Sequence, residues 1–394
     1  MEPSSVVAAV REHGSISAAA RALGVARKTL SDRYHRAKNN PDIKEKAERR
    51  EAQGQQFWRT RANKLNKDLA DLEYLAEQLA GIRQAPVTIP TWMLPERTRK
   101  PRSVVGVLLT DAHAGEVVKP GEIAGINEFN VAICRERIRN LIARSIENGL
   151  RWGADTTIVG SVFALGGDLI SGDIHEELRI TNELTSLEQV RFMVGELVAA
   201  ALKLADAFRF VHIPCVPGNH GRTTIKSTAK MYSRLSYDTM IGDMVRERLQ
   251  HDSRFTWDIS AGTDSITPVF GRNVLLTHGD KMGTGGGQGF AGPMLPIVRG
   301  TKKVQAQQAF IGQRPTLILS GHYHSSGNPY GVLANGSIPG YTEYGNLLRA
   351  AVEPAMQWNF LLTDGPEFLR DRTEVVLSEL GCGAKSSVPH FMAA

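Results

Sequence analysis

Residues 104–113 read VVGVLLTDAH, an apolar and β-branched run that gives way to Thr110, Asp111 and His113. Such a run is typical of a buried β-strand, and the polar residues after it mark the loop at its carboxyl end. The pattern recurs along the chain, so we expect an α/β sheet whose strands end in polar loops on one edge. The later runs are residues 157–165, 208–216, 274–276 and 316–319.

Each run leads into a short polar motif. The five motifs are Thr110-Asp111-Ala112-His113, Gly166-Gly167-Asp168, Pro217-Gly218-Asn219-His220, Thr277-His278-Gly279-Asp280 and Gly321-His322-Tyr323-His324. Because open α/β sheets place their sites at the carboxyl ends of the strands, one rim would collect two carboxylates, one amide and four imidazoles. The candidate metal ligands are Asp111, His113, Asp168, Asn219, His278, His322 and His324.

The chemistry of this donor set predicts the metal. Mixed oxygen and nitrogen donors suit divalent transition metals such as manganese, iron or zinc better than calcium or magnesium. Seven ligands are too many for one tetrahedral zinc site, but they suit two neighbouring ions. Such an ion pair stabilises the attacking and leaving oxygens of a phosphoryl transfer.

In this order the motifs resemble those of the calcineurin-like metallophosphoesterase superfamily, over residues 104–345. The resemblance implies a β-sandwich flanked by helices that binds two divalent ions, with manganese expected and iron, zinc, nickel or cobalt as alternatives. It assigns one ion to Asp111, His113 and His324. It assigns the other ion to Asn219, His278 and His322, with Asp168 bridging the two. His220 would be the catalytic histidine that assists at the leaving oxygen without binding metal.

Two departures from that pattern bear on the substrate. An acidic residue often follows Gly-Asn-His in the superfamily, but here Gly221 and Arg222 follow it. The guanidinium of Arg222 can donate two hydrogen bonds to one phosphate, so Arg222 is a candidate substrate-binding residue. His175, in the polar loop after Asp168, is a second candidate. The arginine–glycine pair that phosphoprotein phosphatases carry near the Gly-Asp motif is missing. The sequence therefore looks closer to the nuclease and phosphodiesterase branches.

The N-terminal part of the chain concentrates the positive charge. Residues 1–100 hold 19 Lys and Arg against 12 Asp and Glu, whereas the rest of the chain is close to neutral. An isolated basic end indicates a polyanionic partner. Its alternative is a solvated, solubilising face.

Residues 14–38, GSISAAARALGVARKTLSDRYHRAK, resemble the small helix-turn-helix modules of bacterial and phage DNA-binding proteins. We expect helices over residues 5–13 and 26–38 with a short helix between them, Gly14 and Gly24 turning the chain, and Ser15 or Ser17 as a cap. The last helix would enter the major groove of DNA. Its candidate DNA contacts are Arg27, Lys28, Thr29 and Arg33. A small helical cap that binds protein is the alternative.

The rest of the chain organises around these two parts. We expect a helix-turn-helix domain at 1–40, a helical, coiled-coil-like arm at 41–83, a proline-rich linker at 84–103, a catalytic domain at 104–380 and a loose tail at 381–394. Leu65, Leu69 and Leu72 begin a short heptad seam in the arm. This seam predicts either a homodimer contact or packing against the catalytic domain.

Composition limits the protein class. Hydrophobic residues make up 42% and charged residues 22%, as in an ordinary globular protein. We expect no membrane span, because no apolar run approaches about 20 residues. The start of the chain lacks a secretion signal, and Cys134, Cys215 and Cys382 are far apart. A cytoplasmic protein is therefore expected, in the host cytoplasm if a phage encodes it.

The combined prediction is a two-metal phosphoesterase that hydrolyses phosphodiester bonds in DNA, a nuclease targeted by its helix-turn-helix. A phosphatase or small-nucleotide phosphodiesterase is the alternative within enzymes. A DNA-binding regulator with a structural metal site is the alternative from another class. His220 argues against the regulator, since a structural site needs no spare acid. Exonuclease or endonuclease action, strand and sequence preference and the physiological metal stay open.

Overall fold

The computed structural model describes residues 3–39, 54–70, 100–283 and 294–380, together with single residues at positions 41, 73, 90 and 93. The chain divides into two compact units, Met1–Pro86 and Val87–Ala394. The predicted tail at 381–394, most of the linker and much of the arm lie outside the described residues. The helices that the structure describes are each too short or too polar to cross a lipid bilayer.

The first unit begins with three short helices, α1 (Pro3–Glu12), α2 (Ile16–Ala22) and α3 (Arg27–Lys38). The hydroxyl of Ser15 caps α2 by accepting a hydrogen bond from the Ala18 amide at 3.1 Å. Gly14 and Gly24 make the turns with positive φ angles of 71° and 66°. The predicted helices and turns are therefore present. Their shared core consists of Val6, Val10, Ala19, Ala20 and Leu30.

Residues 54–70 of the predicted arm are helical. Phe57, Trp58, Leu65 and Leu69 expose more than half of their surface on this helix. Leu72 and the rest of the predicted heptad seam lie outside the described residues, so the dimer contact stays a prediction.

The second unit contains two β-sheets. The first has the order β10-β9-β1-β2-β3-β4. Its parallel strands are β1 (Arg102–Leu109), β2 (Thr157–Leu165), β3 (Val211–Cys215) and β4 (Phe255–Ile259). The antiparallel strands β9 (Met356–Thr363) and β10 (Leu369–Val376) extend it beyond β1.

The second sheet has the order β5-β6-β7-β8. Strands β6 (Arg272–Thr277), β7 (Pro315–Ser320) and β8 (Val332–Ala334) are parallel, and β5 (Asp264–Val269) forms an antiparallel hairpin with β6. The α/β class predicted from the sequence is confirmed. The five predicted strands are all present, but they are shared between two sheets. The third, expected over 208–216, begins later because Phe208 still belongs to the preceding helix.

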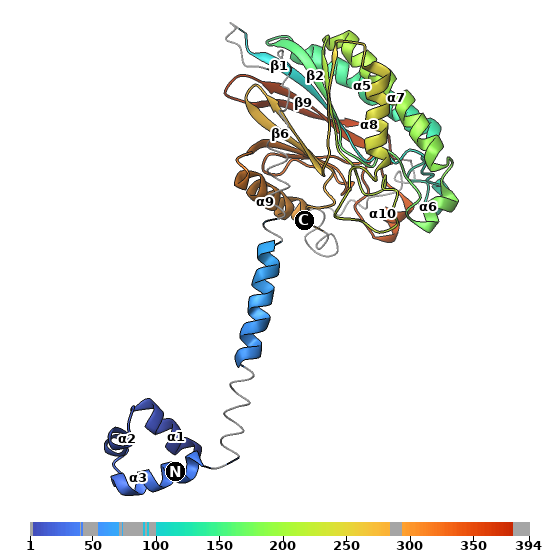
Figure 1. Cartoon of the computed structure of the whole chain (residues 1–394). Helices are drawn as coiled ribbons and strands as arrows, with labels where there is room; N and C mark the ends of the chain where they lie inside the picture. Colours follow the sequence, from blue (N-terminus) through green and yellow to red (C-terminus); the bar gives the residue numbers. More distant parts are fainter. Residues whose placement is uncertain are drawn as a thin grey trace, which may run out of the picture. The chain divides into compact units, whose positions relative to one another are not determined.

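Helices cover the outer faces of both sheets. Figure 1 shows α5 (Val131–Trp152), α7 (Ser186–Phe208) and α8 (Tyr237–Leu249) on one side of the strands and α9 (Met294–Phe310) on the other. Asn130 caps α5, and Thr185 with Glu188 forms a capping box at the start of α7. Short helical turns lie in the loops: η2 (Pro120–Glu122), α6 (Glu176–Thr181) and α10 (Glu343–Leu347).

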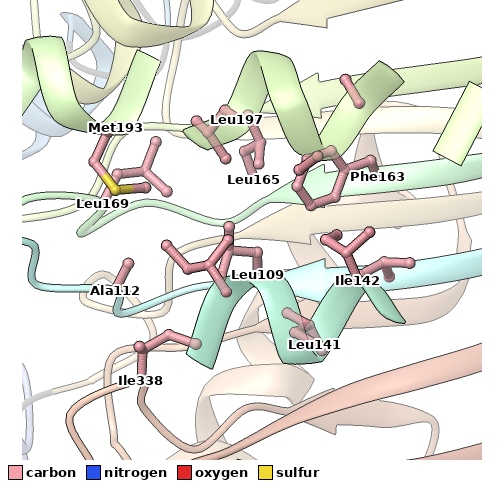
Figure 2. Close-up of a cluster of buried hydrophobic side chains, with 14 of the residues drawn as sticks. Leu109, Ala112, Leu141, Ile142, Phe163, Leu165, Leu169, Met193, Leu197 and Ile338 are labelled. Atoms are coloured by element: carbon pink, nitrogen blue, oxygen red, sulfur yellow. The ribbon is translucent and has the colours of Figure 1, made fainter. Parts of the chain in front are cut away.

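Three apolar clusters fix the resulting four-layer α/β/β/α arrangement. In Figure 2, Leu109 and Leu165 at the ends of β1 and β2 lie among side chains of α5 and α7, such as Leu141 and Leu197. A second cluster joins the inner faces of the two sheets, with Leu108 and Phe360 from one sheet and Leu276 and Leu319 from the other. A third lies beneath α9. Because both sheets are held rigidly, the loops at their strand ends have fixed positions.

Candidate metal centre

The five motif loops meet because hydrogen bonds tie neighbouring strand ends together. The amides of Asp111 and His113 donate to the carbonyls of Gly167 and Asp168, each at 3.0 Å. In the other sheet, the Gly321 amide donates to the His278 carbonyl at 2.8 Å. The loops after β1, β2, β6 and β7 are therefore joined pairwise at the carboxyl ends of their strands, as the sequence predicted.

Three predicted ligands form a first trio, Asp111, His113 and His324, whose donor atoms all lie within 4.8 Å of one another. His324 Nε2 lies 3.4 Å from Asp111 Oδ1 and 3.1 Å from His113 Nε2. One carboxylate and two imidazoles thus converge on a single point, which is a suitable donor set for one divalent ion.

Three others, Asp168, His278 and His322, form a second trio under the same distance limit. His278 Nε2 lies 3.0 Å from Asp168 Oδ2 and 3.0 Å from Asn219 Oδ1. The amide of Asn219 therefore borders the second trio, as the resemblance implied. All seven predicted ligands are brought together, and the two clusters could hold two metal ions. The bridging role of Asp168 stays a prediction.

The two trios are physically linked. Both carboxylate oxygens of Asp111 accept the His322 amide at 3.0 Å, so an acid of the first trio holds the backbone of the second. Asp168 Oδ1 accepts the His220 amide at 2.6 Å, which attaches the third motif to the second trio. A shift of one trio would therefore disturb the other.

The ligand backbones are strained. Asp111, His113, Asp168, His322 and His324 all have positive φ angles, between 42° and 72°. Non-glycine residues rarely adopt this left-handed conformation, which costs about 1–3 kcal/mol at each position. Its occurrence at five of the seven candidate ligands indicates that the packed sheets force these side chains inward.

Two glycines allow the close approach of the loops. A Cβ atom on Gly218 would lie 2.2 Å from Asp168 Oδ1, and one on Gly321 would lie 2.1 Å from Asp111 Oδ2. Each of the two carboxylates therefore lies against a residue without a side chain. This explains the glycine before Asn219 and the glycine before His322.

Backbone carbonyls orient two of the imidazoles. Gly166 O lies 2.9 Å from His278 Nδ1, and Ser171 O lies 3.1 Å from His220 Nδ1. Since a carbonyl only accepts, each Nδ1 carries the proton and each Nε2 is the atom left for the site. For His278 this leaves Nε2 facing Asp168 and Asn219.

Buried charges control the protonation of the centre. Burial lowers the pKa of His278, but Asp168 outweighs it and raises that pKa to about 10. Burial raises the pKa of Asp168, but His278 and His220 outweigh it and hold that pKa well below its usual value. Burial lowers the pKa of His322 to about 4. The buried side chains of Asp168 and His278 therefore form an ion pair at 3.0 Å.

His220 and His175 are neighbours beside the centre. The ring of His220 lies 4.6 Å from that of His113 and 5.5 Å from that of His175, measured between centroids. His175 is exposed and precedes α6. Their catalytic and substrate-binding roles stay predictions, with His220 closer to the ligands.

Arg222 holds the third motif loop. Its guanidinium donates to the carbonyls of Asn219, Thr224 and Ile225, each at 2.9 Å. Three of its five N–H groups therefore stabilise the loop that carries Asn219. The structure gives Arg222 a positioning role, and substrate binding stays a prediction.

Sequence reasoning missed a buried carboxylate, Asp238, in the first turn of α8. Its oxygens accept the amides of Asp168, Leu169 and Gly218 at 2.9–3.2 Å. A Cβ atom on Gly221 would lie 2.5 Å from Asp238 Oδ2, so this carboxylate fills the space beside Gly221, the position that lacks the acid expected from the resemblance. The available signal was the absence of that acid, but nothing local pointed to a residue seventeen positions later.

Glu116 was also missed. One of its carboxylate oxygens lies 3.9 Å from His113 Nδ1. Burial, with help from Glu343 and Glu177, raises the pKa of Glu116 to about 7. The first trio therefore borders a set of carboxylates.

The predicted DNA contacts lie in the first unit. Arg27, Lys28, Thr29 and Arg33 are exposed on α3, while Leu30 packs into the core. Exposure is what a groove-binding helix requires, and DNA binding stays a prediction.

No family model matches this chain, and a search of curated proteins found no matching protein. Functional conclusions therefore depend on the geometry of the site.

Proposed function

We propose that this protein is a two-metal phosphoesterase of the calcineurin-like type that hydrolyses phosphodiester bonds in DNA. The observation that carries the proposal is the pair of linked trios, each with one carboxylate and two imidazoles, at the strand ends of an α/β/β/α unit. A purely structural ion would need one closed set of ligands, whereas two adjacent sets suit phosphoryl transfer.

The residues fit two divalent transition-metal ions. The donor atoms are mutually close and of mixed oxygen and nitrogen type, two in each trio belong to buried residues, and the imidazole of His278 already presents Nε2. Asp111, His113 and His324 would hold one ion. Asn219, His278 and His322 would hold the other, with Asp168 between the two. Manganese is the first candidate, with iron, zinc, nickel and cobalt as alternatives. When bound, the ions supply Lewis acidity and neutralise charge that develops on the phosphate oxygens.

The chain's own groups would perform the remaining steps. The Nδ1–H of His220 is held by the Ser171 carbonyl, so Nε2 is left for the substrate and, when the ring carries a second proton, would donate it to the leaving oxygen. Arg222 fixes the Asn219 backbone, and Asp238 holds the loops of Asp168 and Gly218 together. The chemistry therefore depends on side chains whose positions are set by backbone hydrogen bonds.

The first test measures hydrolysis of single-stranded DNA, double-stranded DNA and bis(p-nitrophenyl) phosphate by the full chain, with manganese and each alternative metal in turn. Metal-dependent cleavage of DNA and of the small diester is expected. A preference for phosphomonoesters or small nucleotides would move the phosphatase or small-nucleotide alternative ahead. Ion binding without any hydrolysis would support the DNA-binding regulator.

DNA targeting is assigned to the first unit because its exposed α3 carries adjacent cations. In the full chain, Arg27→Ala with Lys28→Ala should weaken double-stranded DNA binding and reduce its salt slope by about 2, since each lysine or arginine releases about one counterion. Arg61→Ala with Lys64→Ala, on the exposed 54–70 helix, is the control with equal charge loss. Equal effects of the two pairs would show that α3 has no special role.

A further inference from the structure

Two loops beside the candidate metal centre carry opposite charge. We define the acidic loop as residues 171–185, which follow β2 and hold four acidic residues and one arginine. We define the basic loop as residues 221–236, which follow β3. It contains Arg222, Lys226, Lys230 and Arg234 and no acidic residue. The two loops leave the carboxyl ends of neighbouring parallel strands, so segments of opposite charge begin next to each other at the centre.

The acidic loop borders the first trio. The Glu183 amide donates to the Gly115 carbonyl at 2.8 Å, which ties the loop to the segment after His113. Glu116 of that segment lies beside His113, and Glu343 accepts the Lys119 amide at 2.7 Å. The acids of three chain segments therefore gather on this side. A polyanion would be repelled from it.

The basic loop borders the second trio and is firmly attached to it. Arg222 donates to the Asn219 carbonyl, and the Tyr232 hydroxyl bonds the Gly218 carbonyl at 3.2 Å and Asp280 at 2.7 Å. Lys281, three residues after His278, contacts the same loop: its Nζ lies 3.1 Å from Ser227 Oγ and 4.4 Å from the Tyr232 ring. The loop is therefore attached to the Asn219 motif and to Lys281, which itself pairs with Asp280 at 2.9 Å.

Lys226 and Lys230 are exposed on this loop. A phosphomonoester or mononucleotide bound at the two trios would have no further phosphate to place there. A strand with several consecutive phosphates would, and each neutralised phosphate would release a counterion.

Building on the function proposed above, we propose that the substrate is a polynucleotide strand that runs from the metal centre over the basic loop, with consecutive phosphates at Lys226 and Lys230, and away from the acidic loop. The catalytic unit would then bind the strand through its own surface, separately from the helix-turn-helix.

The test compares a dinucleotide with a single strand of about 12 nucleotides, with manganese, using the full chain. In the wild type, kcat/KM should rise with strand length. Lys226→Ala with Lys230→Ala should reduce the ratio of kcat/KM for the long strand to that for the dinucleotide about tenfold at low salt. It should also reduce the salt slope for the long strand by about 1.4, at about 0.7 per phosphate of a single strand.

Lys203→Ala with Arg248→Ala is the matched control, because both residues are exposed near the ends of α7 and α8 that lie away from the motif loops. This control pair should change neither the ratio of kcat/KM values nor the salt slope. Lys226→Arg with Lys230→Arg should restore the length dependence. Dinucleotide hydrolysis with no benefit from length, or equal effects of the two alanine pairs, would overturn the strand path while leaving the proposed function intact. Absence of metal-dependent hydrolysis of both substrates would instead remove the proposed function.

Discussion

Two buried histidines, one inside the sheets and one at a strand end, have opposite pKa shifts. His212, the second residue of β3, bonds the hydroxyls of Thr256 at 2.9 Å and Thr267 at 3.4 Å, and burial lowers its pKa to about 4. His278, at the end of β6, is equally buried, but Asp168 raises its pKa to about 10. Burial alone favours the neutral imidazole, so the carboxylate partner decides the charge.

This difference extends beyond the two histidines. Between the sheets the strands bury apolar side chains in regular β conformation. At the strand ends the same backbones enter left-handed conformations and place carboxylates and imidazoles together. Packing between the sheets stabilises the strained backbone at the strand ends. This is expected of a site that must be organised before its ligands bind.

The largest effect is expected when the buried negative charge of Asp168 at the strand ends is removed. Asp168→Asn should reduce the bound ions from two to at most one and abolish hydrolysis, because it removes a charged ligand beside His278. Metal analysis and a hydrolysis assay measure both. The control is Asp258→Asn on β4, a partly buried acid that bonds Ser265 in the sheet. Equal losses of bound metal and of hydrolysis in the two variants would contradict a special role for the buried acid at the strand ends.

The next effect separates chemistry from metal binding. His220→Ala should keep both ions while the rate of DNA hydrolysis falls by about 10²–10⁴, the usual contribution of a positioned acid. The loss should be smaller on bis(p-nitrophenyl) phosphate, whose leaving group needs less protonation. Equal losses on the two substrates would contradict the assignment of His220 as the acid.

A smaller effect is expected at Asp238, which bonds the backbone amide of Asp168 and belongs to neither trio. Asp238→Asn places an amide group among backbone N–H donors, so metal affinity should fall by about 10–100-fold. Isothermal titration with manganese, at a temperature where circular dichroism shows a folded variant, measures this loss. Gly221→Asp combined with Asp238→Ala should recover part of the affinity, since a side chain on residue 221 points to the same space. No recovery would mean that the carboxylate must come from α8.

The smallest effect is expected at His212 inside the sheets, where a substitution should alter the free energy of unfolding and leave hydrolysis unchanged. The folded state keeps His212 neutral with a pKa of about 4, whereas the unfolded state has the ordinary value of about 6.5. Between these values the unfolded state binds more protons, so the free energy of unfolding falls as pH decreases, by at most about 3 kcal/mol. His212→Gln should remove this component. Denaturant unfolding at pH values across that window would falsify the assignment if wild type and variant showed the same slope.

The sequence by itself determined the elements and the donor inventory. The predicted strand over 157–165 matches β2, and the predicted helix over 26–38 begins one residue early, because periodicity, capping and turn glycines act over a few residues. The seven candidate ligands were predicted for a similar reason. Each lies within four residues of the carboxyl end of a strand, so a local pattern marks it.

Tertiary structure alone decided how these parts combine. Asp111 and His324 are brought to 3.4 Å although more than two hundred residues separate them, and the division of the strands into two sheets determines that pairing. Asp238 and Glu116 lie outside every motif, and they acquire their surroundings only when other segments pack over them. The burial of a side chain, its bonding partners and its charge depend on contacts between distant segments. A sequence pattern of a few residues therefore cannot predict them.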